Sequence, residues 1–330
     1  MKYIFGLYTV VFLLTVPVQA QQDRDAIRGA AATATKGVGG AKLPSDSLSW
    51  RKGGDVSLSF SQIHLSNWAA GGENSVTLGS VSNLFANYKK DKMIWENYAF
   101  LAYGLIITGE NYSDKRKNSD QINVGSRAGY KMSDNWYYTA ALLGKTQFAP
   151  GYKTQSLPRK EEDKISDFLA PLSLYLSLGL DYKPSSRFAL SFAPVMGKAT
   201  LVRSKYKDNP TILKSSGITQ DLINEGKHSR YEFGGGLIMS MNGAYFEKKV
   251  TYSSQIEFFS NYINNPQNID VVWDFQCRVA LAKHISAGMR INMIYDDDQK
   301  TIKTINEETV IGPAQLQVKQ FFEIGLFYGF

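Results

Sequence analysis

The sequence predicts an all-β fold, a transmembrane antiparallel β-barrel of about twelve strands with long external loops and short periplasmic turns. Three observations predict it. Apolar and polar residues alternate with period two in many segments, the gaps between these segments are alternately long and short, and residues 1–20 resemble an export signal. Alternation gives each strand one apolar and one polar face, as a barrel in a lipid bilayer requires.

The N-terminal region divides into two segments. Residues 1–20 begin with a basic Lys2, continue with an apolar stretch and end in Val18-Gln19-Ala20, which is typical of a cleaved signal peptide. Residues 21–50 are rich in Gly and Ala and predict a flexible periplasmic arm, with insertion into the lumen as the alternative. Residues 51–330 then form one barrel in the outer membrane, with both termini in the periplasm.

The alternation can be followed strand by strand. The expected strands cover residues 55–61, 76–88, 95–107, 122–131, 136–148, 172–182, a segment that starts near 187, and then 231–240, 249–258, 269–281, 285–296 and 315–330. Most are long enough for the roughly 9–11 residues that a tilted membrane strand needs. Pro194 and Gly197 interrupt the seventh strand, because Pro cannot donate to a strand ladder.

The last strand is the most informative one. Leu316, Val318, Ile324 and Leu326 share one parity, and the strand ends in Tyr328-Gly329-Phe330. An amphipathic strand that finishes on an aromatic residue resembles the closing strand of outer-membrane barrels. We therefore expect Tyr328 and Phe330 to act as the assembly signal, with the barrel-assembly machinery as a partner during biogenesis and outer-membrane lipid as the surroundings of the mature barrel.

Charged residues lie on the inward parity of several strands. Such side chains either line an aqueous path or pair with one another and close it. A lumen of about twelve strands is intermediate between filled barrels and wide porins, and we expect it to be closed or narrow, with an open charge-lined path as the alternative. The candidate lumen charges are Arg127, Glu257, Asp274, Arg278, Arg290 and Glu323.

Catalytic and metal sites are weakly represented. His64 and Ser66 have the spacing found in outer-membrane phospholipases, but a three-residue pattern occurs often by chance, and we predict no catalytic residues. Asp296, Asp297 and Asp298 offer carboxylates to a calcium ion, although a solvated acidic loop explains them equally simply. No other cofactor is expected.

Neither the cysteine content nor the net charge points to a further site. Cys277 is the single cysteine, which excludes an internal disulfide and a cysteine-based zinc site. The formal net charge of +7 is spread over loops and turns, so it forms no basic stripe with stacking aromatics and predicts no nucleic-acid partner.

Several segments at the ends of strands resemble a known family. Trp50-Arg51-Lys52-Gly53-Gly54, Asn67–Asn74, Phe148–Tyr152, Asn261–Asp270 and Tyr295–Asp298 are together similar to domain-of-unknown-function family 3078, a family of Bacteroidetes-type outer-membrane β-barrel proteins. The resemblance covers about residues 50–330 and implies location and barrel form, but no activity. Residues of these segments form a candidate ligand or partner rim, namely Trp68, Glu73, Tyr152, Tyr262 and Asn265. A rim that merely packs on itself and caps the barrel is the simpler interpretation.

The sequence thus favours a non-enzymatic outer-membrane protein that serves an envelope protein complex. A narrow transport barrel or porin-like channel for small solutes is the alternative, and a lipid hydrolase is a remote one.

Overall fold

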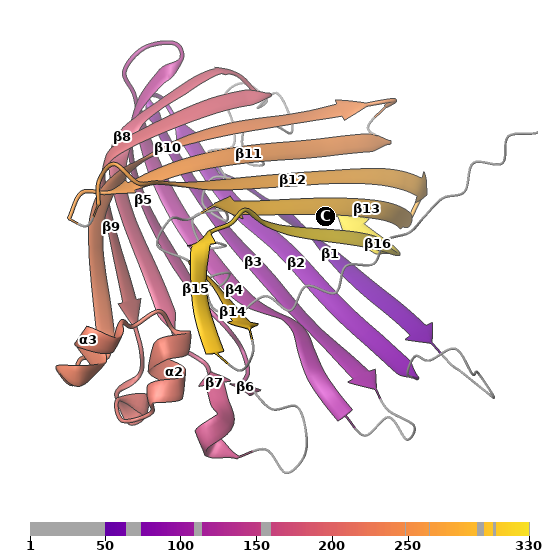
Figure 1. Cartoon of the computed structure of the whole chain (residues 1–330). Helices are drawn as coiled ribbons and strands as arrows, with labels where there is room; N and C mark the ends of the chain where they lie inside the picture. The colour runs from indigo at the N-terminus through magenta and orange to yellow at the C-terminus, as the bar shows by residue number, and fades with distance from the viewer. Residues whose placement is uncertain are drawn as a thin grey trace, which may run out of the picture.

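A closed antiparallel barrel dominates the computed structural model of the chain (Figure 1). The structure describes residues 50–63, 74–108, 114–152, 160–247, 249–263, 265–295, 300–305 and 308–329. Within this part of the chain, the strands follow the order β1-β16-β13-β12-β11-β10-β9-β8-β5-β4-β3-β2 around the barrel. Sequence neighbours therefore pair throughout, and the barrel closes between β1 and β16, which confirms the predicted fold class.

The barrel strands agree with the predicted ones in number and order. They are β1 (Trp50–Ile63), β2 (Ser75–Lys90), β3 (Met93–Thr108), β4 (Asp114–Lys131), β5 (Trp136–Thr146), β8 (Leu172–Ser185), β9 (Phe188–Leu201), β10 (Ser229–Tyr245), β11 (Val250–Asn261), β12 (Ile269–Ala282), β13 (Ile285–Tyr295) and β16 (Gln317–Gly329). Their connections alternate between long and short. We call the two ends of the barrel the loop end and the turn end.

Several strand boundaries differ from the prediction. Strand β4, for example, begins at Asp114 and not near residue 122. Strand β8 continues through Lys183, which the sequence placed in a turn. Strand β9 continues past Pro194 to Leu201, because a bulge absorbs the proline: Gly234 pairs with Met196, but Gly236 pairs with Ala193. The bulge also switches the side-chain parity of β9, so both halves of the strand keep apolar residues outside.

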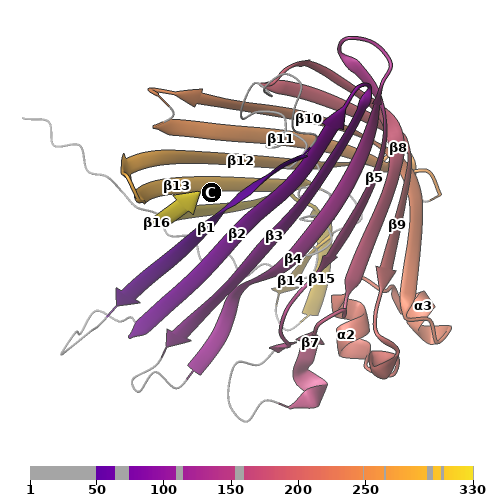
Figure 2. The ribbon, with the colours of Figure 1, turned by 180° about the vertical axis from the view of Figure 1, so that it is seen from behind.

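The loop end carries structure that the alternation of polarity did not predict. Between β5 and β8 lie β6 (Gly151–Tyr152), the 3₁₀ turn η1 (Glu161–Asp163) and β7 (Lys164–Ser166), and between β9 and β10 lie η2 (Ser204–Tyr206), α2 (Pro210–Ser215) and α3 (Gln220–Asn224). We call these elements and their connections the cap. A further hairpin, β14 (Lys300–Ile305) with β15 (Glu308–Ala314), lies on the inner side of β3 and β4 (Figures 1 and 2).

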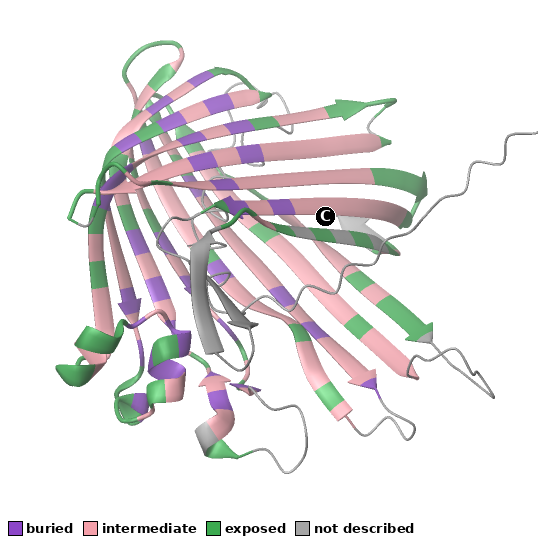
Figure 3. Cartoon of the chain, in the orientation of Figure 1, coloured by how far each residue is buried: buried purple, intermediate pink, exposed green. Residues whose placement is uncertain are grey.

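The outer face of the barrel is apolar, as predicted. On β5 exposed positions alternate with half-buried ones, and purple and green segments also follow one another along β8 and β9 (Figure 3). No helix in the described ranges combines the length and hydropathy that would carry it across a bilayer. Large apolar side chains that the barrel exposes include Leu58, Leu78, Leu84, Val124, Leu142, Leu176, Phe192, Phe233, Ile269, Leu281, Val318 and Ile324.

Aromatic rings gather at the turn end of the barrel. Trp50 lies 5.3 Å from Tyr88 and 5.7 Å from Trp95, measured between ring centroids, and Trp136 lies 4.9 Å from Tyr182. Rings with a polar tip are typical of the boundary between a bilayer and water. The band of apolar side chains thus begins next to an aromatic girdle.

Candidate functional site

The inner faces of β3, β4, β5, β8 and β9, which we call the packed wall, carry a buried ion-pair network. Arg127 on β4 donates to Asp181 on β8 and, at 3.0 Å, to Ser191 on β9. The Lys183 ammonium lies 3.2 Å from the Glu96 carboxylate on β3 and 3.7 Å from Asp181. We call these five residues the lumen network. Two cations meet two buried carboxylates, so the network ties four strands of this wall together with balanced charge.

Packing continues above the lumen network, toward the loop end. Leu143 and Tyr175 are buried, and Tyr98 packs against them. The Tyr98 ring lies over Gly125, where an added Cβ would come within 2.1 Å of it. A cavity of only about 40 Å³ remains beside this layer, which is roughly room for one or two water molecules.

A second charged layer lies closer to the loop end. The Lys198 ammonium on β9 lies 3.0 Å from the Glu232 carboxylate on β10, and Arg230 donates to the same carboxylate at 2.8 Å. Lys198 also lies 5.9 Å from the centre of the Tyr175 ring in the layer below. Charged and apolar layers therefore follow one another along the inside of the packed wall.

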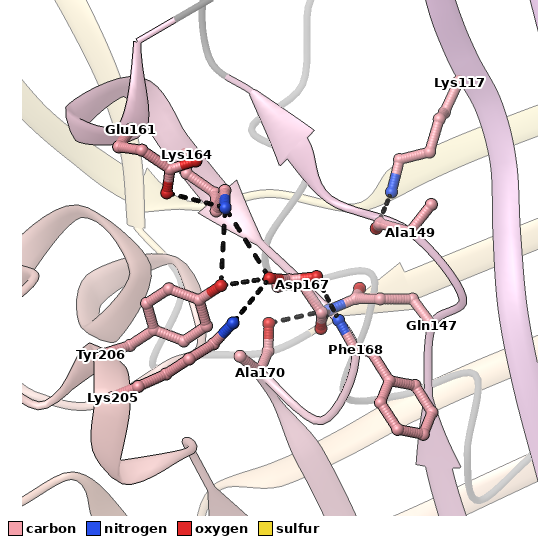
Figure 4. Close-up of polar contacts among 10 residues, drawn as sticks. All are labelled: Lys117, Gln147, Ala149, Glu161, Lys164, Asp167, Phe168, Ala170, Lys205 and Tyr206. Atoms are coloured by element: carbon pink, nitrogen blue, oxygen red, sulfur yellow. Dashed lines mark hydrogen bonds and ion pairs between the residues drawn. The ribbon is translucent and has the colours of Figure 1, made fainter.

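The cap is fastened by a third polar cluster, at Asp167 (Figure 4). Tyr206 donates to the Asp167 carboxylate, and the Lys164 and Lys205 ammonium groups lie 3.7 Å and 3.4 Å from it. Lys164 also lies 2.8 Å from Glu161. The cluster joins residues 164–167 of the β5–β8 connection to residues 205–206 of the β9–β10 connection, so it ties the two connections together there.

Charge and burial set the pKa values in the cap. Burial raises the pKa of Asp167, but the hydrogen bonds from Tyr206, the Phe168 amide and Lys205 outweigh it, and the pKa is lowered. Burial lowers the pKa of Lys164, but the hydrogen bond to Glu161 and the contacts with Tyr206 and Tyr152 together outweigh it, and the pKa is raised. Both shifts keep the ion pair charged over the whole neutral range.

Apolar packing and the side chain of Gln147, which directly follows β5, hold the cap on the barrel. Ile212 and Leu213 of α2 are wholly buried together with Val202 and Ile218. The Gln147 amide donates to the carbonyl oxygen of Ala170 at 2.7 Å and to that of Asp167 at 2.6 Å. The cap is thus anchored from inside the barrel.

The structure places the predicted lumen charges on two walls. Arg127 lies in the lumen network, and Glu257 on β11 is 2 % exposed. Asp274 on β12 accepts a hydrogen bond from Asn292 on β13. Arg278 on β12 and Arg290 on β13 are half-buried, and Glu323 lies opposite Gly288 in the β13–β16 ladder.

The structure gives separate contacts to the predicted rim residues that it describes. Tyr152 lies in β6, under the Lys164 ammonium, which is 5.8 Å from its ring centre. Tyr262 packs edge-on against Phe233 on the outer face and donates to the Pro194 carbonyl at 3.2 Å. Asn265 has a positive φ of 49° and accepts from the Asn268 amide in a tight turn. No contact recorded among the described residues joins these three, and their role in binding remains a prediction.

The remaining predicted site residues lie outside the described residues. These are His64, Ser66, Trp68, Glu73, Asp296, Asp297, Asp298 and Phe330. The Tyr328 backbone pairs with Val56 of β1. Among the residues whose placement is described, no group of three His, Cys, Asp or Glu side chains could hold a metal ion, and the calcium site remains a prediction.

Sequence reasoning missed most of the lumen network and the cap cluster. Asp181 has the inward parity of β8, which is a usable signal, but Lys183 follows the last aromatic residue of that strand and reads as a turn residue. Asp167 and Tyr206 lie on different loops, and no periodicity in the sequence connects them.

Comparison with known proteins identifies a family over part of the chain. Residues 60–152 match the family described as a protein of unknown function, DUF3078. This confirms the resemblance noted above for that segment, from β1 to β6. No curated protein matches the sequence.

Several solved structures are similar in form. The COG4313 outer membrane channel from Pseudomonas putida F1 has a TM-score of 0.40 and 9% identity, covering 88% of this chain and 100% of the channel. The translocator domain of autotransporter NalP from Neisseria meningitidis has a TM-score of 0.37 and 9% identity, covering 92% and 94%. The NanC porin has a TM-score of 0.33 and 11% identity, covering 83% and 98%. At this level of similarity, function has to be inferred from the residues of the chain itself.

Proposed function

We propose that the protein is an integral outer-membrane β-barrel with a closed lumen, which serves an envelope protein complex as a non-enzymatic accessory subunit. In this proposal the turn end faces the periplasm, and the cap is the surface that meets partners outside the cell. In outer-membrane barrels the long loops lie at the external end. The cap is formed by two long connections, β5–β8 and β9–β10, so we assign it to that end.

The outer face of the barrel supports the membrane location. Leu142 and Leu176 on the packed wall and Leu58 and Ile324 on the opposite side are more than half exposed. Contiguous apolar surface on that scale is unfavourable in water and favourable in lipid. Trp50 and Trp136 lie at the turn end, where a bilayer interface would begin.

The lumen network is the single observation that carries the closed lumen. Asp181 has no exposed surface, and Lys183 and Glu96 are nearly as buried. Charged side chains that lined a water-filled path would keep part of their hydration, whereas these have exchanged it for one another. Arg127 reaches from β4 past β5 to β8 and β9. In this proposal the network narrows the lumen from that wall enough to close it.

The cap supports a role in recognition. The Asp167 cluster and the Ile212 core hold both long loops in one arrangement. A surface that is already ordered loses less conformational entropy when a partner binds. A cap of this kind fits an accessory subunit better than it fits the mobile mouth of a solute channel.

Conductance in planar bilayers tests the proposal. We expect the inserted wild-type barrel to conduct no steady current, and a variant with Glu96→Ala, Arg127→Ala, Asp181→Ala and Lys183→Ala to conduct, because it lacks the lumen network. Removing the buried charges together avoids leaving one of them unpaired. Heat-modifiable mobility on gels provides the control for folding.

The transport alternative makes the opposite prediction. Steady wild-type current would refute the closed lumen. A change in ion selectivity in Asp274→Ala and Arg290→Ala would then identify these side chains as lining the path.

A further inference from the structure

The two strands that close the barrel, β1 and β16, are paired over far fewer residues than any other neighbouring strands of the barrel. Strand β1 pairs with β16 only from Asp55 opposite Gly329 to Leu58 opposite Leu326. On its other side β1 pairs with β2 along its whole length, from Trp50 to Ile63, and β16 pairs with β13 from Leu326 to Gln317. We call the β1–β16 boundary the seam. It is joined at the turn end and open toward the loop end.

The open part of the seam leaves two strand edges facing each other. Among the described residues, no strand pairs with the seam edge of Ser59–Ile63 on β1 or with that of Val318–Gly325 on β16. The β16 edge is nearly as long as the 9–11 residues that cross a bilayer. Unpaired backbone groups cost several kcal/mol each in hydrocarbon, so an edge of this length favours the addition of a further strand.

An apolar groove of about 570 Å³ lies along the same seam. Its walls are outward side chains from both strands and their neighbours, including Leu58, Phe60, Leu78, Ile324 and Leu326. Phe60 is 63 % exposed and Phe322, farther along the β16 edge, is 70 % exposed. Large rings with that exposure leave room for further apolar side chains beside them.

The inner side of the groove consists of small residues. Ser59, Gly79 and Gly325 line it there. A Cβ on Gly325 would come within 2.9 Å of the Leu58 carbonyl oxygen, so glycine allows β1 to pass close to β16 at the point where they separate. The two strands therefore diverge from a fixed point and form a wedge.

We propose that the seam binds one extended β-strand of a partner polypeptide, with apolar side chains at alternate positions. The strand would pair with the open edge of β16, place its apolar side chains in the groove, and point the intervening ones toward the small residues on the inner side. Addition of a strand to an exposed edge supplies backbone hydrogen bonds and side-chain specificity together.

Two other occupants fit the seam less well. A lipid acyl chain fills the groove but offers no donor or acceptor to the backbone of Val318–Gly325. A second copy of the barrel would have to bring its own edge into a wedge that β1 and β16 bound on both sides. A single extended segment can form backbone hydrogen bonds with the strand edges and fits between them.

This inference rests on the proposed membrane location but not on the closed lumen. Binding at the seam and ionic current are measured separately, so a conducting barrel would refute the closed lumen and leave the seam proposal standing.

The test uses a fluorescent peptide with the sequence of residues 55–63, which is the chain's own complement to β16. It is added to the full-length barrel in lipid nanodiscs, and binding is followed by fluorescence anisotropy. The control is the same peptide with its backbone amides N-methylated, which keeps every side chain and removes the donors. We expect the unmodified peptide to bind at least about tenfold more tightly than the control.

A disulfide across the seam localises the binding. Ser61→Cys and Glu323→Cys, combined with Cys277→Ala, would face each other if the register of Leu58 and Leu326 continued. We expect the oxidised variant to lose peptide binding by at least about tenfold and the reduced variant to regain it. We also expect slower amide hydrogen exchange over Val318–Gly325 when the peptide is bound.

Several results would overturn the proposal. Equal binding of the two peptides would mean that the groove takes any apolar chain, as it would take lipid. Binding that the disulfide leaves unchanged would mean that the peptide binds elsewhere. No binding, with a mass in solution that corresponds to two copies, would assign the edges to a dimer.

Discussion

The packed wall and the seam are two sides of one barrel, and they differ in the side chains that line the inside. On the packed wall, Arg127 and Tyr175 reach into the lumen and touch side chains from other strands. At the groove of the seam, the inner positions are Ser59, Gly79 and Gly325, and the strands are joined over a short register. Large polar side chains link the strands of the packed wall, whereas the small residues of the groove offer little to link β1 to β16.

This difference indicates that the packed wall is the more rigid side of the barrel. Backbone pairing is present throughout the packed wall, and side-chain contacts between strands are added to it. At the seam, side chains add little to a short ladder. We therefore expect the same kind of substitution to have a large effect on the packed wall and a small one at the seam.

Removal of one partner of the lumen network should have the largest effect. Arg127→Ala leaves Asp181 buried beside Lys183 alone, and breaking a buried ion pair in this way costs about 3–5 kcal/mol of stability. Denaturant unfolding in detergent, followed by tryptophan fluorescence, measures it. Lys131→Ala is the control, because its pair with Asp134 is exposed and contributes about 0–1 kcal/mol.

The double variant Arg127→Leu with Asp181→Leu sharpens this prediction. Loss of both charges should restore most of the stability that Arg127→Ala removes, since no charge is left without its partner. If the double variant were as unstable as the single one, packing and not charge would account for the effect.

Glycine substitutions compare the packed wall with the seam directly. A Cβ at Gly179 on β8 would lie 2.0 Å from the Phe192 carbonyl oxygen, between two strands that are paired on both sides. Gly179→Ala should therefore cost about 1–3 kcal/mol through overpacking. Gly325→Ala meets the Leu58 backbone at 2.9 Å, but β1 has an open edge and can move, so we expect a cost below about 1 kcal/mol.

Gly197→Ala is the control for both glycine variants, because nothing lies within 4 Å of a Cβ there. Similar losses for Gly179→Ala and Gly325→Ala, measured by the same unfolding transition, would contradict the contrast between the two sides.

The sequence predicted the barrel well because period-two alternation is a local signal. Leu172 to Tyr182 alternate without interruption, and β8 is found where the pattern indicates it. Pro194 led to the prediction that this strand is interrupted, but β9 continues past it. A bulge can accommodate a residue that has no backbone N–H to donate. The pattern does not reveal how far two distant strands stay paired, so the short register between Asp55–Leu58 and Leu326–Gly329 became visible only in the structure.

The candidate sites were predicted less completely. Parity identified Arg127 and Glu257 as inward residues, but it does not say which side chains meet across the lumen. The pairing of Arg127 with Asp181 depends on the order of β4, β5 and β8 around the barrel. The Asp167–Tyr206 contact depends on the shapes of two long loops, which polarity patterns do not encode.

A serine-to-alanine pair tests the same comparison with an effect of similar size. Ser191 accepts a hydrogen bond from the Arg127 guanidinium at 3.0 Å, and loss of a hydrogen bond to a charged group costs roughly 1.5–3 kcal/mol. Ser59 lies at the seam groove, and we expect Ser59→Ala to change stability by no more than about 0.5 kcal/mol. Unfolding curves with equal losses for both would place the two serines in equivalent surroundings and contradict the contrast.

Acid should loosen the cap with the smallest effect on the barrel as a whole. The folded-state pKa of Asp167 is below its unfolded value of about 3.9, so its contribution to stability is present above that value and is lost as the pH falls through the folded pKa. The pKa of Lys164 is raised, so its contribution is present below its unfolded value of about 10.4 and is lost only as the pH rises through the higher folded value.

The cap should therefore resist proteolysis across the neutral range and become sensitive first in acid. Pepsin should cleave within residues 160–227 much faster below about pH 3 than near pH 5, relative to a peptide substrate that corrects for its own pH dependence. Asp167→Asn removes the carboxylate that Lys164 and Lys205 share, so trypsin should cleave this variant several-fold faster at neutral pH. Asp208→Asn, in an exposed turn of the same cap, is the control and should behave as wild type. Equal trypsin sensitivity in the two variants would mean that the Ile212 core alone holds the cap, and that the charges around Asp167 serve the surface facing a partner.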